Sequence, residues 1–259
     1  MRDPPGLNGA IDTADGATQL ARKMGIAQPL VSNGNRVPSQ GVLAVEAVTG
    51  ASRKQVRPDL YSEPAVKDDA LDPVDAARAQ EYALLAALLS SPPSNELLGE
   101  IAQLRGDATP LGRAHAALAE AASEATVEVE REYFDLFVGL GRGELLPYGS
   151  YYLTGFLNER PLSRLRDDLA ALGIERVENN FEPEDHAATL CEIMAGLAGR
   201  RFPASAEMQR RFFEKHVVPW MGRLFADMET AASAKFYRSV GSLGRLFLKI
   251  ETEAFRFAN

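Results

Sequence analysis

Residues 183–199 read PEDHAATLCEIMAGLAG, a run that predicts a helix with an apolar body. Pro183 suits a first helical position, where its missing N–H would have no partner in any case. We therefore expect a helix from Pro183 to about Gly199. Glu184 and Asp185 would lie in its first turn, where the helix dipole favours negative charge. Cys191 is expected to pack as a small apolar side chain.

The sequence on either side of this run has the same character. β-branched residues are few, and no stretch alternates polar and apolar residues as a strand would. Ser94 can cap a helix that follows Pro92-Pro93. The larger part of the chain therefore predicts an all-α fold, a large helical bundle. Its other expected helices cover residues 75–89, 94–104, 111–137 with an interruption near Thr126, 162–172, 204–227 and 231–255.

Composition and charge divide the chain into two parts. Residues 61–73, YSEPAVKDDALDP, form a polar, acidic segment with two prolines, which predicts a linker. Residues 1–60 carry seven basic and five acidic residues, a net charge of +2, whereas the remaining 21 basic and 31 acidic residues give −10. We expect a small N-terminal domain over residues 1–60 and a helical domain over residues 74–259, with different partners.

The N-terminal part contains a helix-turn-helix pattern at residues 17–33, ATQLARKMGIAQPLVSN. Ala21 is small where two helices would touch, and Gly25 suits the turn between them. Together with later motifs, residues 7–61 resemble YdaS-like, Cro/repressor-type DNA-binding domains. That resemblance implies binding of operator DNA, although the short segment after Asn33 leaves open a module that keeps only the fold. The candidate DNA-binding residues are Thr18, Gln28, Pro29, Ser32, Asn33 and Arg36.

The larger part holds four motifs in order. They are residues 132–137 (EYFDLF), 146–152 (LPYGSYY), 181–186 (FEPEDH) and 213–220 (FEKHVVPW). Together they resemble the TorD/DmsD/NarJ-like redox-enzyme maturation chaperones over about residues 75–255. The resemblance implies an all-helical cytoplasmic chaperone for a molybdopterin enzyme, such as formate dehydrogenase or a related reductase. It would bind the twin-arginine signal peptide and the apo-enzyme, assist cofactor insertion and hold back export.

A twin-arginine signal peptide has a basic end and an apolar stretch, so its binding site needs an apolar groove flanked by carboxylates. Aromatic and apolar side chains from the first two motifs can form the wall, and carboxylates from the third can pair with guanidinium groups. The same carboxylates could instead only favour a helix start. The candidate client-binding residues are Tyr133, Leu136, Phe137, Pro147, Tyr148, Ser150, Tyr151, Glu182, Asp185 and His186.

Other functions fit the sequence less well. Asp185 and His186 are adjacent and point apart on a helix, so they and His216 do not form a metal or acid–base site. We expect no enzyme activity, no cofactor and no metal. The single cysteine, the missing secretory signal and the short apolar runs predict a cytoplasmic protein without membrane insertion. The sequence leaves a monomer and a homodimer both open. The alternative is a DNA-binding transcriptional regulator whose helical domain senses an enzyme precursor.

Overall fold

The structure is a computed structural model that describes residues 71–125, 128–175 and 182–257. The chain divides into two units, Met1–Ala70 and Leu71–Asn259, and only the second is described here. The predicted helix-turn-helix domain and its six candidate DNA-binding residues therefore lie outside the described residues, as does most of the predicted linker.

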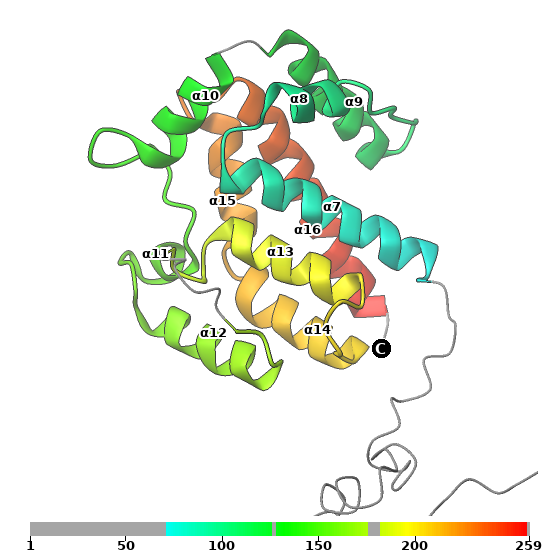
Figure 1. The fold of residues 1–259 in the computed structure, drawn as a ribbon, viewed down its shortest axis with the longest axis vertical. Helices are drawn as coiled ribbons and strands as arrows, with labels where there is room; N and C mark the ends of the chain where they lie inside the picture. Colours follow the sequence, from blue (N-terminus) through cyan, green and yellow to red (C-terminus); the bar gives the residue numbers. More distant parts are fainter. Residues whose placement is uncertain (1–70, 126–127, 176–181, 258–259) are drawn as a thin grey trace, which may run out of the picture. The chain divides into compact units, whose positions relative to one another are not determined.

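Every named element in the described part of the chain is a helix, which confirms the all-α prediction (Figure 1). An isolated antiparallel bridge pairs Tyr148 with His186. Two short π-helices, η2 and η3, continue α10 and α14. The elements are α7 (Pro73–Ser90), α8 (Asn95–Ile101), α9 (Pro110–Glu124), α10 (Glu128–Tyr133), η2 (Phe134–Val138), α11 (Gly149–Thr154), α12 (Arg160–Ala171), α13 (Ala187–Ala198), α14 (Ala206–Phe212), η3 (Phe213–Val217), α15 (Met221–Thr230) and α16 (Phe236–Phe257).

Side chains just before several helices satisfy their free N–H groups. Asp72 accepts a hydrogen bond from the Val74 N–H at 2.8 Å at the start of α7. Ser94 accepts one from the Leu97 N–H at 3.2 Å, which confirms the predicted cap of α8. The helices thus begin where the sequence offers an oxygen acceptor.

Helix α13 lies at the centre of the bundle, alongside α7 (Figure 1). All its residues are buried except Thr189 and Glu192, as expected of a helix that is apolar nearly all round. Cys191 is among the buried residues, and burial raises the pKa of its thiol to about 12. Helix α16 packs against α15, α9 and α7, so the end of the chain closes the core.

Helix α13 begins at Ala187, so the predicted start at Pro183 is wrong. Residues 183–186 form a turn in which the His186 N–H donates to the Pro183 carbonyl at 3.1 Å. His186 then caps the helix, because its Nδ1 accepts from the Ala188 N–H at 3.2 Å. A turn before the helix frees the side chains of residues 184 and 185 for contacts with other elements.

The predicted helix 204–227 is interrupted. Pro219 has no N–H to continue the helical ladder, and the backbone passes through η3 and a turn before α15 begins at Met221. The helix predicted from Ala231 begins only at Phe236. The stretch 111–137 is divided into α9, α10 and η2, and the aromatic-rich 146–152 motif contains a short helix, α11, that the sequence did not predict.

Candidate functional site

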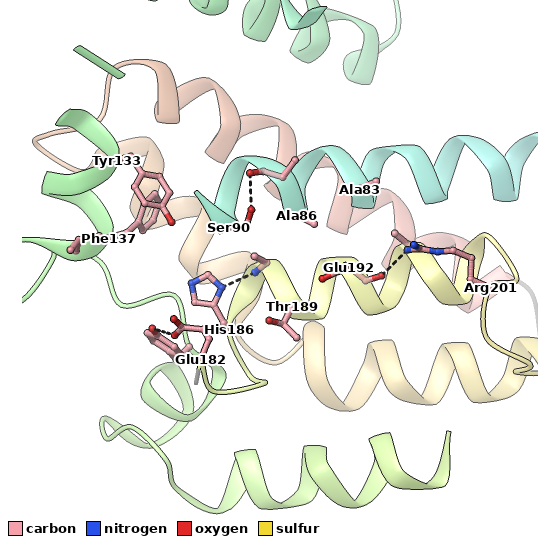
Figure 2. A pocket seen from close by; sticks show the side chains of 15 residues that line it. Ala83, Ala86, Ser90, Tyr133, Phe137, Glu182, His186, Thr189, Glu192 and Arg201 are labelled. Atoms are coloured by element: carbon pink, nitrogen blue, oxygen red, sulfur yellow. Dashed lines mark hydrogen bonds between the residues drawn. The ribbon is translucent and has the colours of Figure 1, made fainter. Parts of the chain in front are cut away.

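A cavity of about 650 Å³ lies between α7, the α10–η2 segment and the first turns of α13 (Figure 2). Its walls combine small residues of α7, two aromatic rings and polar residues from around α13. The lining residues are Ala83, Ala86, Ala87, Ser90, Tyr133, Phe137, Val138, Tyr148, Glu182, His186, Ala188, Thr189, Glu192, Ala195 and Arg201.

The wall contributed by α7 is small because alanine or serine stands at residues 83, 86, 87 and 90, which lie three or four apart on one face. The rings of Tyr133 and Phe137 stand across from it with centroids 5.1 Å apart. The Tyr133 hydroxyl donates to the Leu89 carbonyl at 3.2 Å, which fixes the ring against the end of α7. The cavity is therefore built between rigid helical elements.

Tyr148, Glu182 and His186 form the polar side of the cavity. Figure 2 shows Glu182 and His186 on this side. The Tyr148 hydroxyl donates to the Glu182 carboxylate, and its ring meets the His186 ring edge-on at 5.1 Å. Burial, together with the hydrogen bond to Glu182, raises the pKa of Tyr148. Burial lowers the pKa of His186, and the nearby carboxylates of Glu182 and Asp185 offset only part of this shift. The imidazole is therefore neutral at pH 7.

Asp185 has a structural role beside the cavity. It is 2% exposed, and its Oδ2 accepts from the Ser150 N–H at 2.6 Å. Its carbonyl accepts from the Gly149 N–H at 2.9 Å. These bonds satisfy two free backbone N–H groups at the start of α11, about 35 residues earlier in the chain. The neighbouring Glu184 instead pairs with Arg166 at 2.9 Å.

Five of the ten predicted client-binding residues meet in this cavity: Tyr133, Phe137, Tyr148, Glu182 and His186. The other five, Leu136, Pro147, Ser150, Tyr151 and Asp185, lie outside its lining. Leu136 and Ser150 are fully buried. The Tyr151 hydroxyl accepts from Arg142 Nη2 at 2.5 Å, and its ring lies under that guanidinium.

Glu192 is a cavity residue that the sequence analysis missed. It is the single charged residue of α13, and it stays exposed while nearly all its helix is buried. Its carboxylate makes no hydrogen bond or ion pair with any described residue, while its backbone carbonyl accepts from Arg201 Nη2 at 3.5 Å. A lone acidic residue in an apolar helix is the sequence signal that would have identified it.

In the described part of the chain, no three His, Cys, Asp or Glu side chains gather closely enough to hold a metal ion. His216 bonds to Asp168 through Nε2 at 2.6 Å, and it lines a small second cavity together with Asp185 but without His186. None of the described helices is both long and apolar enough to cross a membrane.

The helical part of the chain is similar to several known proteins. Residues 104–226 match the family described as nitrate reductase delta subunit. The chaperone protein TorD of Vibrio cholerae is 30% identical over 136 residues, which are 49% of this chain and 61% of that protein. TorD of Vibrio atlanticus is 26% identical over 140 residues, 50% of this chain and 65% of that protein.

A crystal structure described as a putative redox enzyme maturation protein from Archaeoglobus fulgidus aligns with a TM-score of 0.44 and 21% identity, covering 66% of this chain and 93% of that one. The present chain thus spans somewhat under two thirds of the TorD sequences it matches. The matches agree with the resemblance carried by the four motifs, and they support the TorD/NarJ-like chaperone family for the helical part of the chain.

Proposed function

We propose that the helical part is a cytoplasmic maturation chaperone for a redox enzyme, and that the α7–α13 cavity binds the twin-arginine signal peptide of its precursor. The client would be a molybdopterin enzyme, for which formate dehydrogenase and related reductases are candidates. By holding the precursor, the chaperone would allow cofactor insertion before export.

The observation that carries this proposal is the mixed lining of the cavity. Tyr133, Phe137 and Val138 offer an apolar wall, while Glu182 and Glu192 offer carboxylates. A guanidinium can donate two hydrogen bonds to one carboxylate, so two carboxylates suit a peptide with two neighbouring arginines. Arg201 is the cation of the lining. Because His186 is neutral at pH 7, it does not add a second positive charge that would repel the peptide.

All three carboxylates expected from the sequence to bind the peptide have partners within the protein. Glu182 accepts from the Tyr148 hydroxyl. Asp185 bonds to Ser150 and Glu184 pairs with Arg166. Of the three, only Glu182 lines the cavity, so the proposal keeps Glu182 and adds Glu192. The acidic part of the chain, with its net charge of −10, would speed the approach of a basic peptide.

Titration of the full-length protein with a labelled synthetic peptide tests the proposal. The peptide would carry Ser-Arg-Arg, a Phe-Leu-Lys segment and an apolar stretch, with a Gln-Gln version as its control, and binding would be followed by fluorescence anisotropy. We expect the Arg-Arg peptide to bind at least about tenfold more tightly, since each charge-assisted pair contributes more than a neutral hydrogen bond. Equal affinity for both peptides, or no binding, would count against the proposed function.

Tyr148 and Tyr151 provide a matched pair of variants. Tyr148 lines the cavity, whereas Tyr151 lies three residues later and pairs with Arg142 outside it. Tyr148→Ala should weaken peptide binding about tenfold, as truncation of an aromatic contact residue commonly does. Tyr151→Ala should leave binding unchanged. Equal losses in both variants would place the peptide elsewhere.

The N-terminal residues extend the proposal to DNA. If residues 1–60 bind an operator, the protein could act as a regulator whose occupancy by a client changes transcription, in a monomer or a homodimer. A mobility-shift assay with DNA upstream of the gene, with and without the Arg-Arg peptide, tests this. Absence of a sequence-specific shift would leave the chaperone role as the proposed function.

A further inference from the structure

A cavity of about 570 Å³ lies between α12 and the part of α13 that the bundle leaves uncovered. Its floor is apolar: Leu169 and Ile193 are buried there, and Ile174 and Phe202 are half-buried. This α12–α13 cavity is not the α7–α13 cavity proposed above to bind the arginines, and it offers a further apolar surface next to it.

The α12–α13 cavity and the α7–α13 cavity share part of their lining. Four residues line both, namely Glu182, Thr189, Glu192 and Arg201. Thr189 and Glu192 are the two residues of α13 that are not buried, and they lie three residues apart on one face of the helix. Thr189, Glu192 and Arg201 can be followed along α13 in Figure 2. Because Thr189 is short and half-buried, a peptide chain can cross α13 over it from one cavity to the other.

The charges around the α12–α13 cavity favour a basic ligand. Its lining holds four carboxylates and two guanidinium groups, those of Glu175, Glu182, Glu184, Glu192, Arg166 and Arg201. Glu184 pairs with Arg166 at 2.9 Å, and Glu182 accepts from the Tyr148 hydroxyl. Glu192 differs from both, because its carboxylate makes no hydrogen bond or ion pair within the part of the chain that the structure describes. A guanidinium bound to Glu192 would lie between the two cavities.

The protein itself places an arginine and an aromatic ring on this face of α13. Arg201 Nη2 donates to the Glu192 carbonyl at 3.5 Å, and the ring of the next residue, Phe202, packs over Gly196. A Cβ on Gly196 would lie 2.2 Å from that ring, so the ring lies against the helix because residue 196 is a glycine. The uncovered face of α13 therefore suits a guanidinium with an apolar side chain close to it in sequence.

The width of a helix sets the spacing between an arginine on Glu192 and an apolar contact beside α13. An α-helix with its side chains is about 10–12 Å across, and an extended chain advances about 3.3 Å per residue. Half of that width, about 5–6 Å, corresponds to about two residues of extended peptide. A side chain two or three positions after the arginine would therefore reach the α12–α13 cavity.

We infer that the peptide site continues over the uncovered face of α13 into the α12–α13 cavity: one arginine of the peptide contacts Glu192, and the apolar residues that follow it pack on Ile193 and Phe202. This inference rests on the proposed function and extends its contact surface. The α12–α13 cavity would distinguish clients by the apolar side chains that follow their arginines.

Two peptides measure the contribution of the α12–α13 cavity. Both carry two neighbouring arginines and one spacer residue; one peptide continues with Phe-Leu and the other with Ala-Ala. For the unmodified full-length protein, fluorescence anisotropy should show at least about tenfold tighter binding of the Phe-Leu peptide, because partial burial of two large apolar side chains contributes that much. Glu192→Gln should weaken both peptides about fivefold and keep the preference, since it replaces a charge-assisted hydrogen bond by a neutral one.

A matched pair of variants on α12 locates the apolar contact. Ala170 and Ala171 are both exposed, but Ala170 lines the α12–α13 cavity and Ala171 lines a different cavity, beside α14. Ala170→Trp should fill the α12–α13 cavity and remove the preference for the Phe-Leu peptide, while the affinity for the Ala-Ala peptide stays unchanged. Ala171→Trp should keep the full preference, and circular dichroism would verify that both variants are folded.

A preference that survives Ala170→Trp, or that is lost equally in Ala171→Trp, would overturn the inference. Equal affinities of the unmodified protein for the two peptides, or unchanged binding in Glu192→Gln, would overturn it as well. Each of these outcomes leaves the comparison of Arg-Arg and Gln-Gln peptides as the separate test of the proposed function. If neither peptide bound, the proposed function would fail together with the inference.

Discussion

Replacement of Asp185 by alanine provides a quantitative test of its assigned role. Its Oδ2 is the acceptor for the buried N–H of Ser150, at 2.6 Å, and the residue itself is 2% exposed. Asp185→Ala leaves that N–H without a partner, which costs about 1–3 kcal/mol. It also removes a carboxylate from the N-terminus of α11, which costs about 1 kcal/mol. Because the two effects share one hydrogen bond, we expect a total loss of about 2–3 kcal/mol rather than their sum.

The assay is thermal unfolding of the full-length protein followed by circular dichroism at a helical wavelength. A loss of 2–3 kcal/mol corresponds to a melting temperature lower by about 4–12 °C for a unit of this size. Asp185→Asn keeps an oxygen acceptor but loses the charge, so its loss should be about half as large.

Glu184 supplies the matched control. It carries the same charge one residue earlier, but it pairs with Arg166, whose side chain is 51% exposed. Glu184 itself is 13% exposed, but its partner is half exposed to water, so the pair contributes about 1 kcal/mol and Glu184→Ala should lower the melting temperature less than Asp185→Ala. If Asp185→Ala and Glu184→Ala were equally stable, or if Asp185→Ala melted like the unmodified protein, the structural role of Asp185 would be refuted.

Three more predictions follow from contacts elsewhere in the bundle. Glu132 accepts from the backbone N–H groups of Lys235, Phe236 and Tyr237 at 2.7, 3.2 and 2.8 Å. Glu132→Ala should therefore lower the free energy of unfolding, measured by urea denaturation, by about 3 kcal/mol, and a loss below about 1 kcal/mol would contradict this. A Cβ on Gly244 would lie 2.5 Å from the Phe225 ring, whereas one on Gly222 would meet nothing within 4 Å. Gly244→Ala should therefore lower the free energy of unfolding by about 1–3 kcal/mol and Gly222→Ala should not, and denaturation of both variants would check this. Burial lowers the pKa of His186 in the folded protein below 6.5, its ordinary value in the unfolded chain. As the pH falls below 6.5, the unfolded chain binds a proton at His186 that the folded protein does not yet bind, so the free energy of unfolding should decrease. His186→Gln should flatten that fall in denaturation curves from pH 7 to 5, and an unchanged slope would argue against it.

Helical periodicity was sufficient to predict the class of the fold and most helices from the sequence. It failed where contacts distant in sequence decide a helix end. Residues 183–186 form a turn because Asp185 bonds to the start of α11, and α16 begins at Phe236 because Glu132 satisfies its first N–H groups. Neither partner lies within the local window that periodicity uses.

The site was predicted in part for a related reason. The four motifs identified Tyr148, Glu182 and His186, which do meet in the cavity, but they did not distinguish residues that line it from residues that hold it together, such as Asp185 and Ser150. The wall supplied by α7 carries no motif, since alanine at residues 83, 86 and 87 marks only a small-residue face. Glu192 was detectable in principle as a single acidic residue in an apolar helix.

The bonds that Glu132 and Arg78 make to α16 also bear on how the protein is made. Glu132 bonds to residues that follow it by more than a hundred positions, and Arg78 pairs with Glu251, close to the last described residue. On a ribosome these acceptors and donors stay unpaired until α16 has been synthesised, because contacts of such long sequence separation form late. We therefore expect a chain that stops before α16 to lack a finished helical bundle.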